Sequence, residues 1–163
     1  MTIMKALPLA LFLTACSGAG HIPPEENNIQ RISVVPQSFD TTWNMVVEWF
    51  VLRGTPVDRM SKVDGVITSE ANLRADHELD CGQASGRISW ATAKLENIRG
   101  QINVVVREVG PDESKVLVSV FGKAQSNVRN AYGNVISSEA ANCVSSGALE
   151  AELFEYLELG IPE

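Results

Sequence analysis

A long amphipathic helix is predicted from the spacing of apolar residues in the first half of the chain. Apolar side chains recur every three or four residues: Phe39, Trp43, Val46, Val47, Phe50 and Val51. This spacing places them on one helix face. Ser38 is a good N-cap, and Gly54 followed by Pro56 is a typical helix end. We therefore predict a helix that packs its apolar face against a sheet.

Short apolar runs on both sides of this helix predict strands. Residues 31–36 are β-branched and end in a proline, which is typical of a strand. Residues 56–60 and 66–70 are predicted as a second and a third strand, separated by a turn that contains Asp64 and Gly65. Asp-Gly is a strong hairpin signal. A β-hairpin is therefore predicted directly after the helix.

The clearest strands are residues 102–109 and 116–121, which are joined by a polar turn. Successive strand residues point to opposite faces, so Asn103 and Arg107 should share a face with Val105. Ile102, Val104 and Val106 should then face the core. A final helix is predicted over residues 147–157, with Leu149, Leu153, Tyr156 and Leu157 on its apolar side.

These elements predict an α+β fold. The expected order is β-α-β-β-β-β-α, with an antiparallel sheet of about four to five strands and two helices packed on one face. Residues 71–100 show no clear period and contain Cys81 and Trp90. A segment of this length inside a compact domain is more often a functional or covalently fixed loop than a structureless one.

The first residues have the composition of an export signal. Lys5 supplies a positive charge, residues 6–13 are apolar, and Thr14, Ala15 and Cys16 follow. This arrangement resembles the lipobox of bacterial lipoproteins. The resemblance implies cleavage before Cys16, attachment of a diacylglyceryl group to its thiol, and acylation, with palmitate as a typical chain, of the new amino group. A non-lipidated signal cut near Ala15 and an uncleaved anchor are the alternatives.

The expected organisation is therefore a signal peptide at 1–15, a lipidated N-terminus and flexible tether at 16–29, and a single domain at 30–163. The tether has no hydrophobic period and is rich in glycine, proline and asparagine. His21 lies in it and is expected to be solvated. Ser17 stands where aspartate would retain such a lipoprotein in the inner membrane, which implies the outer membrane of a Gram-negative bacterium.

Charge and cysteine content narrow the function further. The chain has 20 acidic against 13 basic residues, a net charge of −7, so nucleic acid is not an expected partner. Membrane association should then rest on the acyl chains rather than on positive charge. Cys81 and Cys143 are expected to pair in an oxidising compartment. A loop of about 60 residues closed by this bond is worth roughly 4 kcal/mol in the chain-entropy model.

The first helix and the hairpin after it also carry a family resemblance. The segment from Ser38 to Trp43, followed by residues 63–68, is similar to the opening of small envelope lipoprotein domains with a Gly-x-Ile-Thr element. The relatives that this suggests are helix-grip-like accessory lipoproteins of the outer-membrane β-barrel assembly machinery. The resemblance implies a fold and an envelope setting, and it carries no catalytic residues.

One cluster of reactive side chains is a candidate site: Asp76, His77, Glu78, Asp80 and Cys81. Its spacing matches no established zinc motif, and a single histidine lacks the nucleophile and orienting partner of a hydrolase. The sequence also has no phosphate-binding or dinucleotide motif. We expect a charged loop here, no cofactor and no metal. A metal-dependent hydrolase at His77 is the third hypothesis.

The sequence thus predicts a non-enzymatic lipoprotein, exposed to the periplasm or on the cell surface, that acts as an envelope scaffold. Its partner would be an envelope protein, and the membrane would be bound through Cys16. The sheet face with Asn103 and Arg107, or the 71–100 segment, is the candidate contact surface. The alternative is a module that binds a small molecule or lipid between the long helix and the sheet.

Overall fold

The computed structural model describes residues 20–25, 27–85, 87–88 and 91–159. The expected signal peptide at 1–15 and Cys16 lie outside these residues. The elements are β1 (Gly20–Ile22), β2 (Ile32–Val35), α1 (Phe39–Leu52), β3 (Arg59–Ser61), β4 (Val66–Ala71), β5 (Leu79–Asp80), β6 (Gln83–Ser85), β7 (Arg87–Ile88), β8 (Ala91–Gly110), β9 (Glu113–Asn130), β10 (Val135–Ser145) and α2 (Ala148–Leu159).

The fold is α+β, with two helices and an antiparallel main sheet. That sheet has eight strands: β3-β4-β8-β9-β10-β5 in order, with β2 also paired to β9 and β7 to β8. Strands β1 and β6 form a separate two-stranded ribbon. The prediction of four to five strands in the order β-α-β-β-β-β-α was therefore wrong in number and order. It missed strands that are short or built from small and polar residues.

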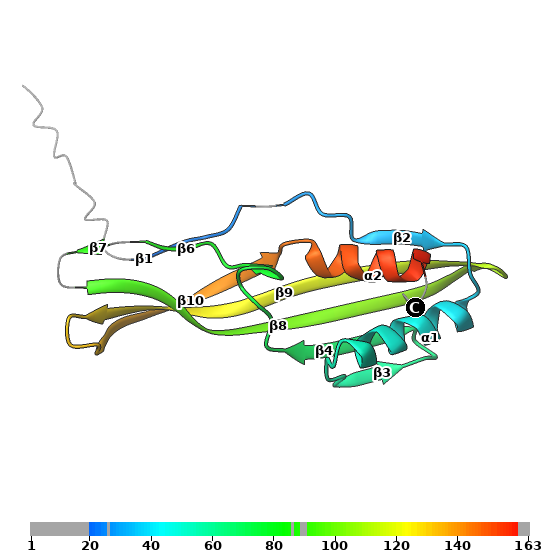
Figure 1. Cartoon of the computed structure of the whole chain (residues 1–163), viewed down its shortest axis with the longest axis horizontal. Coiled ribbons are helices and arrows are strands. Elements are labelled where there is room, and N and C mark those ends of the chain that lie inside the picture. Colours follow the sequence, from blue (N-terminus) through cyan, green and yellow to red (C-terminus); the bar gives the residue numbers. More distant parts are fainter. Residues whose placement is uncertain (1–19, 26, 86, 89–90, 160–163) are drawn as a thin grey trace, which may run out of the picture.

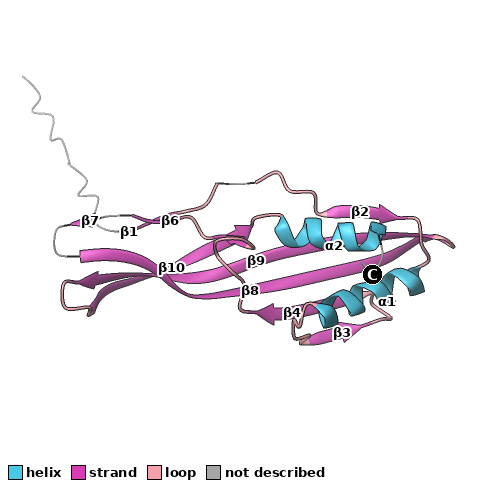
Figure 2. Ribbon diagram, in the orientation of Figure 1, coloured by secondary structure: helices cyan, strands magenta, loops and turns pink. Residues whose placement is uncertain are grey.

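Two long strands, β8 and β9, give the molecule its elongated shape and run along its whole length (Figure 1). We call the part with α1, α2, β2, β3 and β4 the helical half. We call residues 91–99, 123–130 and 135–142, with the ribbon β1–β6 and β7, the arm. Both helices lie over the same half of the sheet (Figure 2).

Helix α1 begins and ends as its sequence indicates. The Ser38 side chain accepts a hydrogen bond from the Thr41 backbone N–H at 3.3 Å, and Asp40 stands in the first turn. Both contacts satisfy the positive end of the helix. Gly54 follows the helix with φ of 65°, a conformation that other residues rarely adopt.

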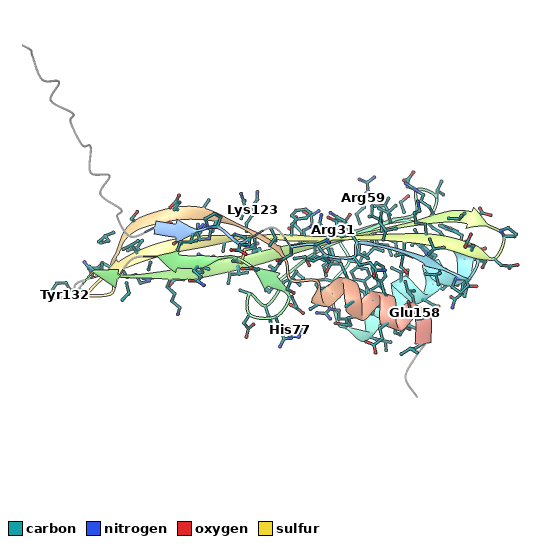
Figure 3. The ribbon with its side chains drawn as sticks, turned by 90° about the horizontal axis from the view of Figure 1, so that it is seen from above. Arg31, Arg59, His77, Lys123, Tyr132 and Glu158 are labelled. Atoms are coloured by element: carbon teal, nitrogen blue, oxygen red, sulfur yellow. A yellow bond between two sulfur atoms is a disulfide. The ribbon has the colours of Figure 1, made fainter. Side chains whose placement is uncertain are left out.

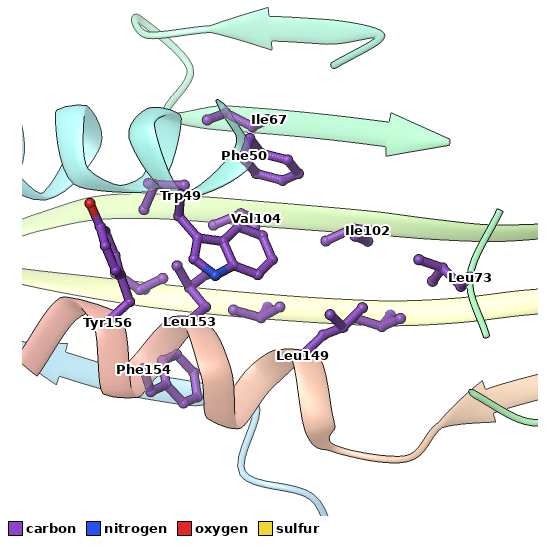
Figure 4. Packing of buried hydrophobic residues seen from close by; sticks show 14 of the residues in the cluster. Trp49, Phe50, Ile67, Leu73, Ile102, Val104, Leu149, Leu153, Phe154 and Tyr156 are labelled. Atoms are coloured by element: carbon purple, nitrogen blue, oxygen red, sulfur yellow. The ribbon is translucent and has the colours of Figure 1, made fainter. Parts of the chain in front are cut away.

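The main core lies between the two helices and the inner face of the sheet (Figure 4). Phe50 from α1, Leu153 from α2 and Val104 of β8 are all buried in this core. The predicted inner residues Ile102, Val104 and Val106 are all fully buried. This half of the fold therefore rests on large apolar side chains in close contact.

The arm has an inner face of small residues instead. Ala124, Ser126 and Val128 alternate along β9 and are buried. The segment from residue 72 to 80 crosses the sheet where Gly100 pairs with Gly122. A Cβ atom on Gly100 would lie 2.3 Å from the Leu73 side chain, so the crossing requires a residue without one.

The sulfur atoms of Cys81 and Cys143 lie 1.99 Å apart, at disulfide distance, beside this crossing. Cys143 lies on β10, and the next residue, Val144, pairs with Asp80 of β5. The pair ties the chain directly after the 72–80 segment to β10 at the base of the arm. Residues 71–100 are therefore not one loop, because they contain β5, β6, β7 and the first half of β8.

A single bulge lets β8 serve both halves. Between the pairs Glu96–Gln125 and Arg99–Lys123, two residues of β8, Asn97 and Ile98, stand opposite the single residue Ala124 of β9, and Asn97 has φ of 54°. The extra residue reverses the alternation of side chains. Ala91 and Leu95 therefore face inward in the arm, while even-numbered residues such as Ile102 face inward in the helical half.

The prediction of a flexible tether at residues 16–29 was wrong for its central residues. Gly20–Ile22 forms β1, which pairs with residues 83–85 of β6. His21, expected to be solvated, is half-buried, and its Nε2 lies 2.6 Å from the backbone oxygen of Cys81. Backbone pairing, which leaves no hydrophobic period in the sequence, holds this segment in place.

Candidate interaction surfaces

The face of the sheet opposite the helices is open, and its strand register sets the order of its side chains. The strand pairing places four apolar residues directly beside one another: Ile32 on β2, Leu117 on β9, Val105 on β8 and Val66 on β4. Ile32 is 50% exposed and Leu117 37% exposed. We call this set the aliphatic row. It is a band of apolar side chains across four strands, without a covering layer in the described structure.

Two pairs of basic residues lie on either side of the aliphatic row. Arg107 is directly opposite Lys115, and Arg99 is directly opposite Lys123. All four side chains are exposed, and none of them forms an ion pair with another described residue. Like charges directly opposite on neighbouring strands repel each other. We call these two pairs the basic pairs; they are eight positions apart on β8, about 27 Å along a strand.

The helical side has the opposite charge. Helix α2 has four glutamates and no basic residue, and Glu152, Glu155 and Glu158 are exposed. Arg59 and Lys123 lie on one side of the sheet and Glu158 on the other (Figure 3). Exposed basic residues therefore gather on the open face, where Glu70 is an acidic neighbour of Arg99 and Lys123, and the net charge of −7 conceals this division.

Asn103 and Arg107 lie on the open face with Val105, as the alternation predicted. Asn103 Oδ1 accepts a hydrogen bond from Gln101 Nε2 at 3.1 Å, and the Arg107 guanidinium donates to the backbone oxygen of Asp64. That contact holds Arg107 over the edge of the β3–β4 hairpin. Arg107 belongs to a basic pair, whereas Asn103 lies between the two pairs.

The segment that follows β4 serves as a structural junction. Glu78 is buried, with 5% of its surface exposed. Its carboxylate binds the Arg53 guanidinium and accepts a hydrogen bond from the Arg74 backbone N–H at 2.7 Å. Arg53 also binds Glu152 of α2, and its Cζ lies 5.4 Å from the centre of the Trp49 ring. These contacts join the end of α1 to α2 and to the crossing segment.

The structure separates the reactive residues around His77. The Glu78 carboxylate points to Arg53, while His77 and Asp76 are exposed. Asp80 Oδ1 accepts a hydrogen bond from the Gly82 N–H at 2.8 Å. No group of three or more potential metal ligands gathers among the described residues. A metal-dependent hydrolase at this position therefore finds no assembled site in the described part of the chain.

The space between α1 and the sheet, where a ligand was considered, is filled by Trp43 and Phe50, which are both buried. A hollow of about 430 Å³ lies instead between the two helices. Its walls include Trp49, Leu52 and Tyr156. Among described residues, Trp49 Nε1 and the Tyr156 hydroxyl have no hydrogen-bond partner of standard geometry. Burial raises the pKa of Tyr156, and the nearby Glu48 carboxylate raises it further.

Comparison with known proteins gives no relatives: no protein-family model, no curated protein and no solved structure matches the chain. Among the described helices, none has the length and apolar character needed to cross a membrane.

Sequence reasoning missed the basic pairs because they depend on strand register. Arg99 and Lys123 lie outside the strands that the hydrophobic pattern predicted. Lys115 stands just before a predicted strand, and only the pairing of β8 with β9 brings it opposite Arg107. The lysines at both ends of the apolar segment 115–123 were the available signal, but they do not identify the residues opposite them on the neighbouring strand.

Proposed function

We propose that this protein is a non-enzymatic, lipid-anchored scaffold of the bacterial envelope that binds an acidic partner protein on the open face of its sheet. The observation that supports this most is the two basic pairs. Each brings like charges together without an ion-pair partner among described residues. Carboxylates of a partner would relieve this repulsion on binding.

The aliphatic row supplies the apolar centre of such an interface. Interfaces typically combine an apolar core with a polar or charged rim, and this face has that arrangement. The partner we infer has an apolar strip flanked by two groups of acidic side chains about 27 Å apart along a strand direction. Lipidation at Cys16 would anchor the complex in the outer membrane, and a role beside the barrel assembly machinery belongs to this proposal.

Charge reversal tests the proposed face. Arg107→Glu and Lys115→Glu, made separately in the full-length protein, should each weaken co-purification with the envelope partner, and raised salt should weaken it for the unaltered protein. Arg74→Glu is the matched control, because Arg74 is exposed but stands outside the open face. Equal loss in all three variants, or none in the first two, would contradict the proposal.

A second candidate function is binding of a small molecule between the helices. It is favoured by the hollow of about 430 Å³ and by Trp49 Nε1 and the Tyr156 hydroxyl, which make no hydrogen bond of standard geometry with described residues. Native mass spectrometry of the purified protein would reveal a retained compound. Leu52→Trp should narrow the hollow and abolish retention, whereas Val51→Trp, on an exposed neighbouring residue that does not line it, should not.

A further inference from the structure

The far end of the arm is an exposed apolar tip. It is formed by the β9–β10 turn and the start of β10, residues 130–138, a run of nine residues without a charge. Tyr132 is 90% exposed, Val135 46% and Ile136 48%. Tyr132 stands almost wholly in solvent beside two half-exposed apolar side chains, and this uncharged apolar tip is suited to contact with a partner.

The turn is well defined and holds Tyr132 outward. The Asn130 side-chain oxygen accepts hydrogen bonds from the backbone N–H groups of Tyr132 and Asn134, each at 3.0 Å. Gly133 has φ of 82°, which permits the tight return of the chain. Figure 3 shows Tyr132 at the end of the molecule opposite the helices.

The N-terminal strand begins at this same end. At the arm tip the strand pairing places four residues beside one another: Arg87 on β7, Thr92 on β8, Arg129 on β9 and Val135 on β10. Ser85, only two residues before Arg87, pairs with Gly20 of β1. Cys16 precedes Gly20 by four residues, which reach at most about 14 Å. An acyl chain on Cys16 therefore enters the membrane close to the arm tip.

We propose that the tip formed by residues 130–138 rests in the headgroup region of the membrane as a second contact beside the lipidated Cys16. This inference rests on the lipid anchor in the proposed function. Tyrosine is enriched at membrane interfaces, where its ring meets the apolar boundary and its hydroxyl stays wet. The absence of charge in the run removes the main cost of such a contact.

The contact would fix the orientation of the whole protein relative to the membrane. β9 has 18 residues, a length of about 60 Å in extended strand, and the helices lie toward its other end. The arm would then stand on the membrane, hold the helical half away from it, and present the open face sideways to a partner. A free tether at 16–29 would impose no such direction.

A fluorescent label at the tip tests this contact. We would place Ala131→Cys in the full-length acylated protein, where Cys81 and Cys143 are paired and Cys16 carries lipid, so that the new thiol alone reacts. The protein would be reconstituted in phosphatidylcholine vesicles that contain brominated lipid. Val63→Cys, at a 98% exposed residue in the helical half, is the control. Bromine should quench the label at 131 and leave that at 63 bright.

Changing the tip should remove the effect. Tyr132→Ser with Val135→Ser and Ile136→Ser should restore most of the fluorescence at 131 while the acylated protein still floats with the vesicles. Equal brightness at 131 and 63 in floating, unaltered protein would overturn the tip contact and leave both the anchor and the open-face proposal in place. Failure to float would overturn it together with the anchor. Protection at 131 only after envelope proteins are added would assign the tip to a protein.

Discussion

The two halves of this molecule share the same two long strands but are stabilised in different ways. The helical half buries Trp43, Phe50 and Leu153 against the sheet. The arm buries Ala124 and Ser126 in the corresponding alternation, beneath a ribbon of backbone-paired strands. Since small side chains bury little apolar area, the arm depends more on backbone hydrogen bonds and on the Cys81–Cys143 bond. A continuous sheet can thus pass from a hydrophobic core to a thin extension.

The largest expected effect is a core cavity in the helical half. Phe50→Ala should lower the free energy of unfolding by about 3–5 kcal/mol, because Phe50 is 1% exposed and its removal leaves an unfilled space. Chemical denaturation would measure this. Val51→Ala, at an exposed neighbour, is the control and should change little. A similar loss at both positions would mean that the core does not lie where the structure places it.

Loss of the disulfide should weaken the arm first. Cys81→Ser with Cys143→Ser should reduce stability by up to about 4 kcal/mol in the loop-entropy model. Hydrogen exchange should show faster exchange in residues 123–130 and 135–141 than in residues 102–106, because the arm has the smaller core. Uniform acceleration along both halves would show that they unfold together, and the comparison would then fail.

A methyl group added where the 72–80 segment crosses the sheet should have an intermediate effect on stability. A Cβ atom on Gly122 would lie 2.6 Å from Leu79 Cδ1 and 2.8 Å from the Arg99 backbone oxygen. Gly122→Ala should therefore displace the 72–80 segment and cost about 1–3 kcal/mol. Gly133→Ala separates crowding from backbone conformation, since that glycine has a positive φ but open space around it. Thermal unfolding should show a loss of stability at Gly122 from crowding, because that glycine has no positive φ, and a loss at Gly133 from backbone conformation; an unchanged unfolding temperature for Gly122→Ala would contradict the close packing of the crossing.

The smallest effect concerns acid sensitivity on the arm. Hydrogen bonds from Arg129 and Asn127 lower the pKa of Glu96 to about 2 from 4.5. A lowered folded-state pKa gives stability that is present above pH 4.5 and is lost as the pH falls toward 2. Glu96→Gln should remove this part of the acid dependence. Carboxyl NMR titration of Glu96 would check the pKa directly, and a midpoint near the ordinary value would contradict the network.

The contrast between the halves also explains what sequence reasoning recovered. Helix α1 and the β3–β4 hairpin were predicted because large apolar residues and the Asp64-Gly65 turn mark them. β9 beyond Phe121 was missed because Gly122, Ala124 and Ser126 face inward there and give no hydrophobic period. β1 was assigned to a tether for a similar reason. In the arm, pairing rather than side-chain hydrophobicity carries the structural information.

The candidate surface was predicted only in part. Alternation was enough to place Asn103 and Arg107 on a solvent-facing side of their strand. The partners of Arg107 and Arg99 across the ladder depend on the register of β8 with β9 and on the bulge near Asn97. Register is a property of two segments together, and no local pattern specifies it.

The central claim is that the open face, not the helical face, binds the partner. A photo-crosslinking residue would be placed at Leu117 in the aliphatic row and, separately, at Val51, which is 72% exposed on α1. Both full-length proteins would be irradiated in intact cells. We predict one reproducible envelope protein attached at position 117 and none at 51. Attachment at 51 with none at 117 would contradict the account.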